Sequence, residues 1–339
     1  MADYDFLILG SGLAGTVLGF RLQEAGKRVL LVGSPTLSAA SRVAAGLCNP
    51  LTGPRMVKTW LADTLFPVAR NFYAQLGEGF FYPLPIYRPF GNQKAATRWL
   101  RKFGEDTEYI PYAEFQKKEF FYQNTWGSLQ ITQGGFVDTS TLLDTLQARL
   151  AFRAATVSDE ALEISPAGVR WNGLTFGAVI FCRGAADAHS RFWSDLPFDP
   201  VKGEILDVQF MKTSWEGILN GTCWVVPHPG QGHRVGATYT RETLDTTPTT
   251  TARQQIQERL ERLLPQSNYT ILQQRAGVRP ATQDHRPLIG RHRQHKNLLI
   301  FNGFGSKGCT LIPYFSACMR DFLLQDAALD PAVYPYRQN

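Results

Sequence analysis

Six residues near the start of the chain have the spacing of a loop that binds phosphate. Gly10 permits a tight turn, Gly12 lets a pyrophosphate approach the backbone, and Gly15 permits close contact between helix and strand. The helix that follows would point its free N–H groups and the positive end of its dipole at the phosphate. The predicted cofactor contacts in this loop are Gly10, Ser11, Gly12, Leu13, Ala14 and Gly15.

The sequence around this loop has the pattern of a βαβ unit. Residues 6–9 form a continuous apolar run, which is typical of a parallel strand buried on both faces. Apolar residues then recur at helical spacing up to Gly26, which can end a helix, and residues 29–32 form a second apolar run. This context supports a nucleotide-binding interpretation, because a glycine loop by itself is a weak signal.

The end of the second predicted strand lacks the acid that such folds usually place there to bind a ribose. Gly33 and Ser34 occupy this position. A hydrogen bond to a charged acceptor contributes about 1.5–3 kcal/mol. Its loss would weaken cofactor binding roughly 10- to 100-fold unless Ser34 or the backbone replaces it. We expect Gly33 and Ser34 to adjoin the cofactor, and the sequence leaves open what replaces the acid.

The composition is that of a soluble globular protein with 339 residues, of which 44% are hydrophobic and 19% charged. The net charge of +6 suits anionic ligands or an RNA surface, although no dense basic run is present. Five cysteines, an odd number without a CxxC pair, argue against a disulfide framework or a metal site and favour a cytoplasmic location. We expect no signal peptide and no membrane span. The sequence does not indicate an oligomeric state.

The chain alternates between two kinds of secondary-structure pattern. Residues 131–198 and 266–339 return to an α/β pattern, whereas 72–130 have little helical periodicity and 199–265 are rich in strand patterns with one helix around 250–264. We therefore expect an α/β protein with an α+β second domain. A Rossmann-like FAD/NAD(P)-binding domain (1–71, 131–198 and 266–339) is interrupted by a β-rich substrate domain (72–130 and 199–265).

Further motifs are spread over most of the chain: SRVAAG (41–46), GGFVDTSTLLDTL (134–146), FCRGA (181–185), VKGEILDV (201–208), VVPHPGQGHRVGAT (225–238), AGVRPATQDHRPLIG (276–290) and NGFGSKG (302–308). Together with the first loop they resemble the D-amino acid oxidase/glycine oxidase superfamily of FAD-dependent oxidoreductases. The resemblance fades over about 55–130. The closing motifs also resemble the oxidase part of a bifunctional enzyme that modifies the wobble uridine of tRNA.

The resemblance implies noncovalent FAD as the cofactor. The implied contacts beyond Gly33 and Ser34 are Ser41, Arg42, Ala45, Gly46, Gly184, Gly303, Gly305, Ser306, Lys307 and Gly308. The backbone and dipole of the last helix can face the flavin edge that gains negative charge on reduction, and positive potential there favours electron uptake. Cys309 is interpreted as a small buried residue rather than a point of attachment.

The resemblance also implies that Arg279, in GVRP (277–280), binds the substrate carboxylate. A planar guanidinium can hold a carboxylate through two hydrogen bonds, which orients the α-carbon against the flavin. Lys307 is a catalytic candidate that can add charge or assist dioxygen, although it can equally face solvent, and Arg279 can instead form an internal ion pair. Tyr239 is the third catalytic candidate. The substrate pocket is expected to include Arg279, Tyr87, Arg88, Tyr239 and His285.

The sequence thus predicts an FAD-dependent amine or amino-acid oxidase or dehydrogenase. The α-hydrogen of a primary or secondary amine leaves as hydride to flavin N5, and the imine hydrolyses in water. Three alternatives stay open. They are an FAD amine oxidase acting on a tRNA wobble-uridine side chain, a nicotinamide dehydrogenase with an ordinary Rossmann domain, and a flavin-binding protein without turnover. A small-molecule substrate is favoured over a nucleic acid partner.

Overall fold

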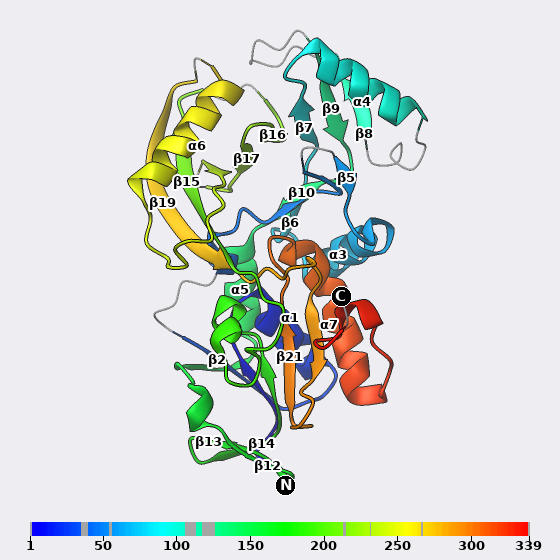
Figure 1. Ribbon diagram of the computed structural model, residues 1–339, viewed down its shortest axis with the longest axis vertical. Helices are drawn as coiled ribbons and strands as arrows, with labels where there is room; N and C mark the ends of the chain where they lie inside the picture. The colour runs from blue at the N-terminus through cyan, green and yellow to red at the C-terminus, as the bar shows by residue number, and fades with distance from the viewer. Residues whose placement is uncertain are drawn as a thin grey trace.

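The computed structural model of the chain contains two large sheets, one above the other along the long axis of the molecule (Figure 1). The structure describes residues 2–34, 40–53, 56–105, 113–116, 126–212, 215–230, 232–265 and 267–337. The lower sheet is mainly parallel and holds the N-terminal strand, and the upper sheet is mainly antiparallel. The expected combination of an α/β part and a β-rich part is confirmed.

The lower sheet has five parallel strands in the order β11, β2, β1, β14 and β21. These are β1 (Tyr4–Leu9), β2 (Val29–Gly33), β11 (Ala151–Ala154), β14 (Leu174–Phe181) and β21 (Leu298–Asn302). Antiparallel strands β12 (Glu163–Ser165), β13 (Gly168–Trp171) and β20 (Leu288–Arg291) extend it. The strands β2 and β21 are buried throughout, as expected where helices and loops cover both faces.

Helices pack beside this sheet and beside one another. α1 (Leu13–Glu24) contacts α5 (Thr139–Gln147) and α7 (Gly308–Gln325), and α7 also contacts α3 (Ala62–Leu76). Asp138 caps α5, because its side chain accepts hydrogen bonds from the backbone N–H groups of Ser140 and Thr141 at 3.1 Å each. Among the described residues, no helix combines the length and the hydropathy that crossing a bilayer requires.

The upper sheet has eight strands in the order β19, β15, β18, β17, β16, β7, β9 and β8. Their bounds are β7 (Ile86–Pro89), β8 (Ala113–Gln116), β9 (Ser128–Ile131), β15 (Val201–Phe210), β16 (Ile218–Asn220), β17 (Trp224–Pro227), β18 (His233–Gly236) and β19 (Tyr269–Arg279). α6 (Thr250–Leu263) covers one face, where its Ile256 and Leu260 pack against Leu206 and Val225 of the sheet. Because strand side chains alternate, the neighbouring residues point to the opposite face.

Short elements connect the two large sheets. One small sheet contains β3 (Leu47–Cys48), β10 (Gly135–Val137) and β6 (Phe81–Pro83), and another pairs β4 (Leu51–Thr52) with β5 (Val57–Lys58). The short helical segments are α2 (Ala40–Val43), η2 (Asp159–Ala161), η3 (Gly184–His189) and η4 (Pro331–Val333). Of these helical segments, η3 lies where the chain passes from β14 to β15, whereas η2 lies between two strands of the lower sheet and η4 follows α7.

Residues 72–130 contain more helix than their weak periodicity indicated, because α4 (Gln93–Glu105) lies there. Ala96, Trp99, Leu100 and Phe103 recur at helical spacing in the sequence, so a signal for this helix was present and was missed.

β19, which was expected within the cofactor-binding part, pairs with β15 over its whole length, from Val201 opposite Arg279 to Phe210 opposite Tyr269. We therefore propose to draw that boundary near residue 280 rather than 266.

Candidate active site

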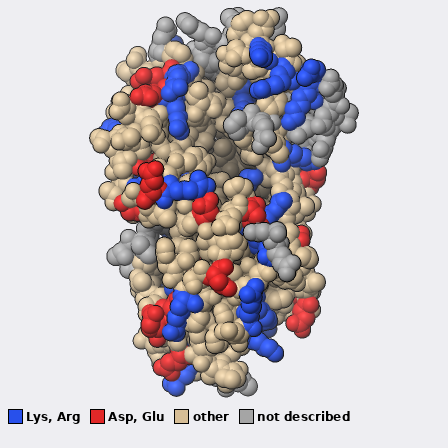
Figure 2. Space-filling view, in the orientation of Figure 1, with Lys and Arg blue, Asp and Glu red and all other residues tan. Residues whose placement is uncertain are grey.

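A cavity of about 810 Å³ lies between the two large sheets. Its walls come from the loop after β1, from the start of α7, and from the face of the upper sheet opposite α6. The space-filling view shows the hollow between the two upper lobes of the molecule (Figure 2). Ligand pockets usually measure about 300–1,000 Å³, so this cavity has room for more than an amino acid.

The first glycine loop forms one end of the cavity, which Gly10, Ser11, Gly12, Leu13 and Ala14 line. A Cβ atom at Gly10 would overlap the carbonyl oxygen of Cys182, and Gly10 has a φ of +112°. Only glycine therefore fits between the loop and the end of β14. Gly12 caps α1 without a side-chain hydrogen bond, so the positive end of the helix dipole adjoins the cavity. Gly15 faces away, and a Cβ there would overlap the Gly10 carbonyl.

The segment after α2 forms a second wall. Ser41, Ala45 and Gly46 line the cavity, and the Ser41 hydroxyl accepts a 3.0 Å hydrogen bond from the Leu13 N–H. Gly46 has a φ of +70°, and a Cβ there would overlap the Val137 carbonyl. Arg42 does not line the cavity, because its guanidinium donates to the Asp144 carboxylate at 2.7 Å on the surface.

The start of α7 forms a third wall. Gly305, Ser306, Lys307 and Gly308 line the cavity, and the first turn of α7 has no side-chain cap and no acid. Burial, and then the nearby Arg286 guanidinium, lower the pKa of the Lys307 ammonium. Gly303 lies outside the lining and has a φ of +78°. Two helix N-termini, those of α1 and α7, thus adjoin the same cavity.

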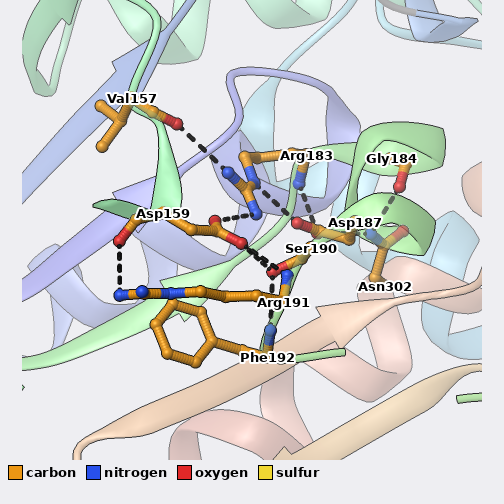
Figure 3. A network of polar contacts seen from close by, with 9 residues as sticks. All are labelled: Val157, Asp159, Arg183, Gly184, Asp187, Ser190, Arg191, Phe192 and Asn302. Atoms are coloured by element: carbon orange, nitrogen blue, oxygen red, sulfur yellow. Dashed lines mark hydrogen bonds and ion pairs between the residues drawn. The ribbon is translucent and has the colours of Figure 1, made fainter. Parts of the chain in front are cut away.

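A buried polar network fixes the strand ends beside these walls (Figure 3). Arg183 donates to the carboxylates of Asp187 and Asp159 at 2.7 Å each and to the Val157 carbonyl at 3.1 Å. The Asn302 amide at the end of β21 donates to Asp187 at 2.7 Å and to the Gly184 carbonyl at 2.9 Å. Burial raises the pKa of Asp187, and Arg183 offsets part of this effect. The network holds Gly184, which lines the cavity, in a fixed position.

The upper-sheet wall of the cavity carries Arg279, at the end of β19. A Cβ at Gly203 of β15 would overlap the Arg279 guanidinium, so the side chain lies directly over this glycine. The guanidinium is 4.4 Å from the centre of the Tyr239 ring, and its Nη1 donates to the Thr238 carbonyl at 3.3 Å. Burial lowers the pKa of Arg279. No ion pair reaches Arg279 from any of the described residues, so its charge has no internal counterion.

The sequence that forms these walls matches a known family. The model of FAD dependent oxidoreductases, DAO, matches residues 5–321 of the chain. The chain belongs to the DAO family of FAD dependent oxidoreductases. It is therefore an oxidoreductase whose cofactor is FAD, which excludes an ordinary nicotinamide dehydrogenase.

Curated relatives and solved structures extend this assignment. The chain is 32% identical to a glycine oxidase from Bacillus licheniformis, over 95% of the chain and 93% of that protein. It is 23% identical to the tRNA 5-methylaminomethyl-2-thiouridine biosynthesis bifunctional protein MnmC of Idiomarina loihiensis, over 91% of the chain but only 54% of that protein. The chain thus spans about half the length of that relative. The crystal structure of glycine oxidase from Geobacillus kaustophilus superposes with a TM-score of 0.82 at 21% identity, covering all of both chains.

The cavity of this DAO-family protein fits FAD. The glycines of the first loop and of the Gly46 turn leave room for a cofactor against the backbone, and the two helix N-termini favour its negative groups. Cys309 lines the cavity, but a hydrogen bond with the Cys48 thiol and burial raise the pKa of Cys309 well above its usual range. Its thiol therefore stays protonated and is a poor nucleophile.

The region of Gly33 and Ser34, which the sequence placed beside the cofactor, shows which side chains lie where the usual acid would stand. A Cβ at Gly33 would overlap the Ser11 side chain, so Ser11 fills the space that an acidic side chain would need. Gly33 itself does not line the cavity, whereas Ser34 does. The Thr156 hydroxyl donates to the Ser34 hydroxyl at 3.1 Å, and Thr156 also lines the cavity. This end of the site therefore presents hydroxyl groups rather than a carboxylate.

The remaining substrate candidates separate into two groups. Arg88 and Tyr239 line the cavity with Arg279. Tyr87 instead packs in the core beneath α6, and His285 is an exposed turn residue with a φ of +59°. Both lie outside the lining.

The sequence did not single out the roles of Arg183, Thr156 and Asn302 in this DAO-family site. The spacing of four residues between Arg183 and Asp187 was the available signal.

Proposed function

We propose that the protein oxidises an amino acid, or another amine that carries a carboxylate. The observation that carries this proposal is Arg279, a partly buried guanidinium that has no counterion among the described residues and lines the cavity that fits FAD. A buried charge is costly unless it is paired, so a bound carboxylate supplies the missing partner. The similarity to a protein named glycine oxidase supports an amino-acid substrate.

The residues of the chain would hold the substrate in place. Arg279 can bind the carboxylate through two parallel hydrogen bonds, and Gly203 and Tyr239 fix the guanidinium from below and from the side. When bound, FAD would supply a two-electron acceptor for the hydrogen on the α-carbon of the amine, and the imine that remains would hydrolyse in water. Lys307 and the α7 N-terminus keep positive potential at the cofactor wall, where negative charge develops.

One anaerobic experiment tests the reaction class. The purified yellow protein is mixed without oxygen with glycine, sarcosine, proline, D-amino acids and simple secondary amines, and the flavin absorbance is followed. We expect at least one carboxylate-bearing amine to bleach the flavin, and readmitted oxygen then separates an oxidase from a dehydrogenase. If none of these compounds bleaches the flavin, the amino-acid proposal is wrong.

A second candidate function is the oxidation of an amine on a tRNA wobble uridine. The relative from Idiomarina loihiensis and a basic surface on α4 favour it. Lys94, Arg98 and Arg101 are exposed on α4, and Figure 2 shows the Lys and Arg side chains of this region beside the hollow. This candidate predicts tRNA binding whose affinity falls steeply as salt rises. Absence of such binding by the purified protein would exclude it. A cytoplasmic location, proposed from the cysteine pattern, suits both candidates.

A further inference from the structure

Two partly buried arginines, not one, face the cavity without a carboxylate partner among the described residues. Arg88 of β7 and Arg279 of β19 both line it. In the described part of the chain no hydrogen bond or ion pair reaches the Arg88 guanidinium, and Arg279 has only the Thr238 carbonyl. Burial lowers the pKa of Arg88, with no acid to oppose the effect.

The other buried arginines near the cavity are paired. Arg183 binds Asp159 and Asp187, each at 2.7 Å, and Arg275 binds Asp207, with Nε to Oδ2 at 2.7 Å. Arg183 and Arg275 thus each have an acid partner of the kind that Arg88 and Arg279 lack among the described residues. Leaving a guanidinium unpaired in a largely desolvated place is unfavourable, so the pair left open is suited to anions that arrive with a ligand.

The alternation of the strands explains why both arginines face the same cavity. Tyr87 packs beneath α6, so the next residue, Arg88, points to the opposite face of the sheet. Asn220, Trp224 and Ile205 line the cavity from the strands in between. Asn220 lies opposite Trp224 in the neighbouring strand, and Gly236 lies opposite both Trp224 and Ile205. Residues that lie opposite each other point to the same face of a sheet, so Asn220, Trp224 and Ile205 share the face that lines the cavity. An apolar floor of Trp224 and Ile205 thus separates the two charges.

We propose that the substrate is an extended amino acid with a second acidic group, whose α-carboxylate meets Arg279 and whose distal carboxylate meets Arg88. This inference rests on the proposed amino-acid oxidation and names its substrate class. β19 and β7 are five strand spacings apart in the sheet order. With about 4.8 Å per spacing in a flat sheet, this separation suits a chain longer than that of the smallest dicarboxylic amino acids. The carbon chain between the acids would cross the Trp224 and Ile205 floor.

The test uses pairs of compounds of equal length that differ only in the distal group. Racemic aspartate, glutamate, 2-aminoadipate and 2-aminopimelate are compared with amino acids that end in a methyl group, by the Kd for anaerobic flavin reduction. The unreactive dicarboxylates glutarate, adipate and pimelate are compared with their monocarboxylates by the shift they cause in the flavin spectrum. We expect at least one dianion to bind about 10- to 100-fold more tightly than its neutral-ended partner.

Variants then assign this preference to Arg88. Arg88→Gln should abolish the advantage of the dianion and leave binding of the neutral-ended partner within about twofold, while Arg88→Lys should keep part of it. Arg262→Gln on α6 is the matched control, because this exposed arginine lies on the other face of the same sheet. The inference would be overturned if Arg88→Gln still bound the dianion more tightly than its neutral-ended partner. It would also be overturned if the unaltered protein showed no such preference for the dianion.

The outcomes also separate this inference from the proposed function. If monocarboxylic amino acids reduce the flavin and a second acid brings no advantage, only the dicarboxylate inference fails. If no amino acid reduces the flavin, the proposed function fails, and the unreactive dicarboxylates still report whether Arg88 and Arg279 bind a dianion. A response only to an RNA ligand would overturn the small-molecule assignment of Arg88.

Discussion

The two ends of the cavity differ in whether backbone or side chains line them. At the cofactor end the walls are backbone: glycine turns at Gly10 and Gly46 and the N-termini of α1 and α7. At the substrate end they are single side chains, among them Arg88, Trp224 and Arg279, from strands far apart in the sequence. A backbone wall tolerates few residue types, whereas a side-chain wall can change without changing the fold.

Because of this difference, we expect substitutions at one end to change the stability of the fold and substitutions at the other end to change substrate specificity. A substitution at the cofactor end must move main chain, so it should cost folding and FAD binding together. A substitution at the substrate end should alter what is bound and leave the FAD-loaded fold intact. The predictions for Gly46, Arg279 and Ser34 would break this contrast if the two kinds of effect appeared at the wrong end, and the prediction for His233 concerns the stability of the upper sheet.

The largest effect is expected for Gly46→Ala. The new methyl group would overlap the Val137 carbonyl, and a φ of +70° disfavours any residue with a Cβ. Overpacking costs about 1–3 kcal/mol and left-handed backbone about 1–2 kcal/mol. Gly173→Ala is the matched control, because its φ is +78° but nothing lies within 4 Å of the new atom. Denaturant unfolding should show a lower free energy of unfolding for Gly46→Ala, and its absorption spectrum should show less bound flavin. Equal losses in the two variants would contradict the backbone-wall interpretation.

Acid should weaken the upper sheet through His233. Burial lowers its pKa from 6.5 to about 4, and its ring packs edge-on to Phe210 at 5.1 Å. A base with a lowered folded pKa gives stability that is complete above pH 6.5 and is lost as the pH falls towards 4, by at most about 3 kcal/mol. His233→Phe should flatten this part of the profile of unfolding free energy against pH. An unchanged slope in His233→Phe would contradict the assignment.

Arg279→Ala should change binding rather than folding. Losing a charge-assisted contact of about 1.5–3 kcal/mol raises the apparent KM for carboxylate substrates roughly 10- to 100-fold. The flavin content and Tm should stay close to those of the unaltered protein. Arg241→Ala is the control, since Arg241 binds Asp199 at 2.8 Å on the surface and does not line the cavity. Loss of FAD from Arg279→Ala would place Arg279 at the cofactor end instead.

The smallest effect is expected for Ser34→Ala. If the Ser34 hydroxyl is one of several that replace the missing acid, its loss costs about 0.5–1.5 kcal/mol, or roughly a 2- to 10-fold rise in the FAD Kd. Titration of the apoprotein with FAD measures this change. Ser165→Ala on β12, where the hydroxyl donates to the Gly168 carbonyl at 3.1 Å, serves as control. A loss beyond 100-fold would show that Ser34 alone carries ribose binding.

The sequence predicted the cofactor end better than the substrate end, for a physical reason. The loop at 10–15 and the start of α7 are local, so each motif contains its own strand, turn and helix signals. Arg88 and Tyr87 are neighbours in the sequence, and only the pairing of β7 within the upper sheet decides which of them reaches the cavity. Periodicity cannot reveal such a register, because it does not say which strand pairs with which.

The contact between Gly33 and Ser11 constrains how this cofactor site can evolve. An acid at position 33 would collide with the Ser11 side chain, so that change alone should be deleterious even though it restores a favourable ribose contact. Replacing Ser11 by glycine first would remove the obstacle. The effects of substitutions at positions 11 and 33 therefore depend on each other, and their order matters. As long as Ser11 is present, an acidic residue at position 33 is disfavoured, so selection should retain hydroxyl groups at this part of the site.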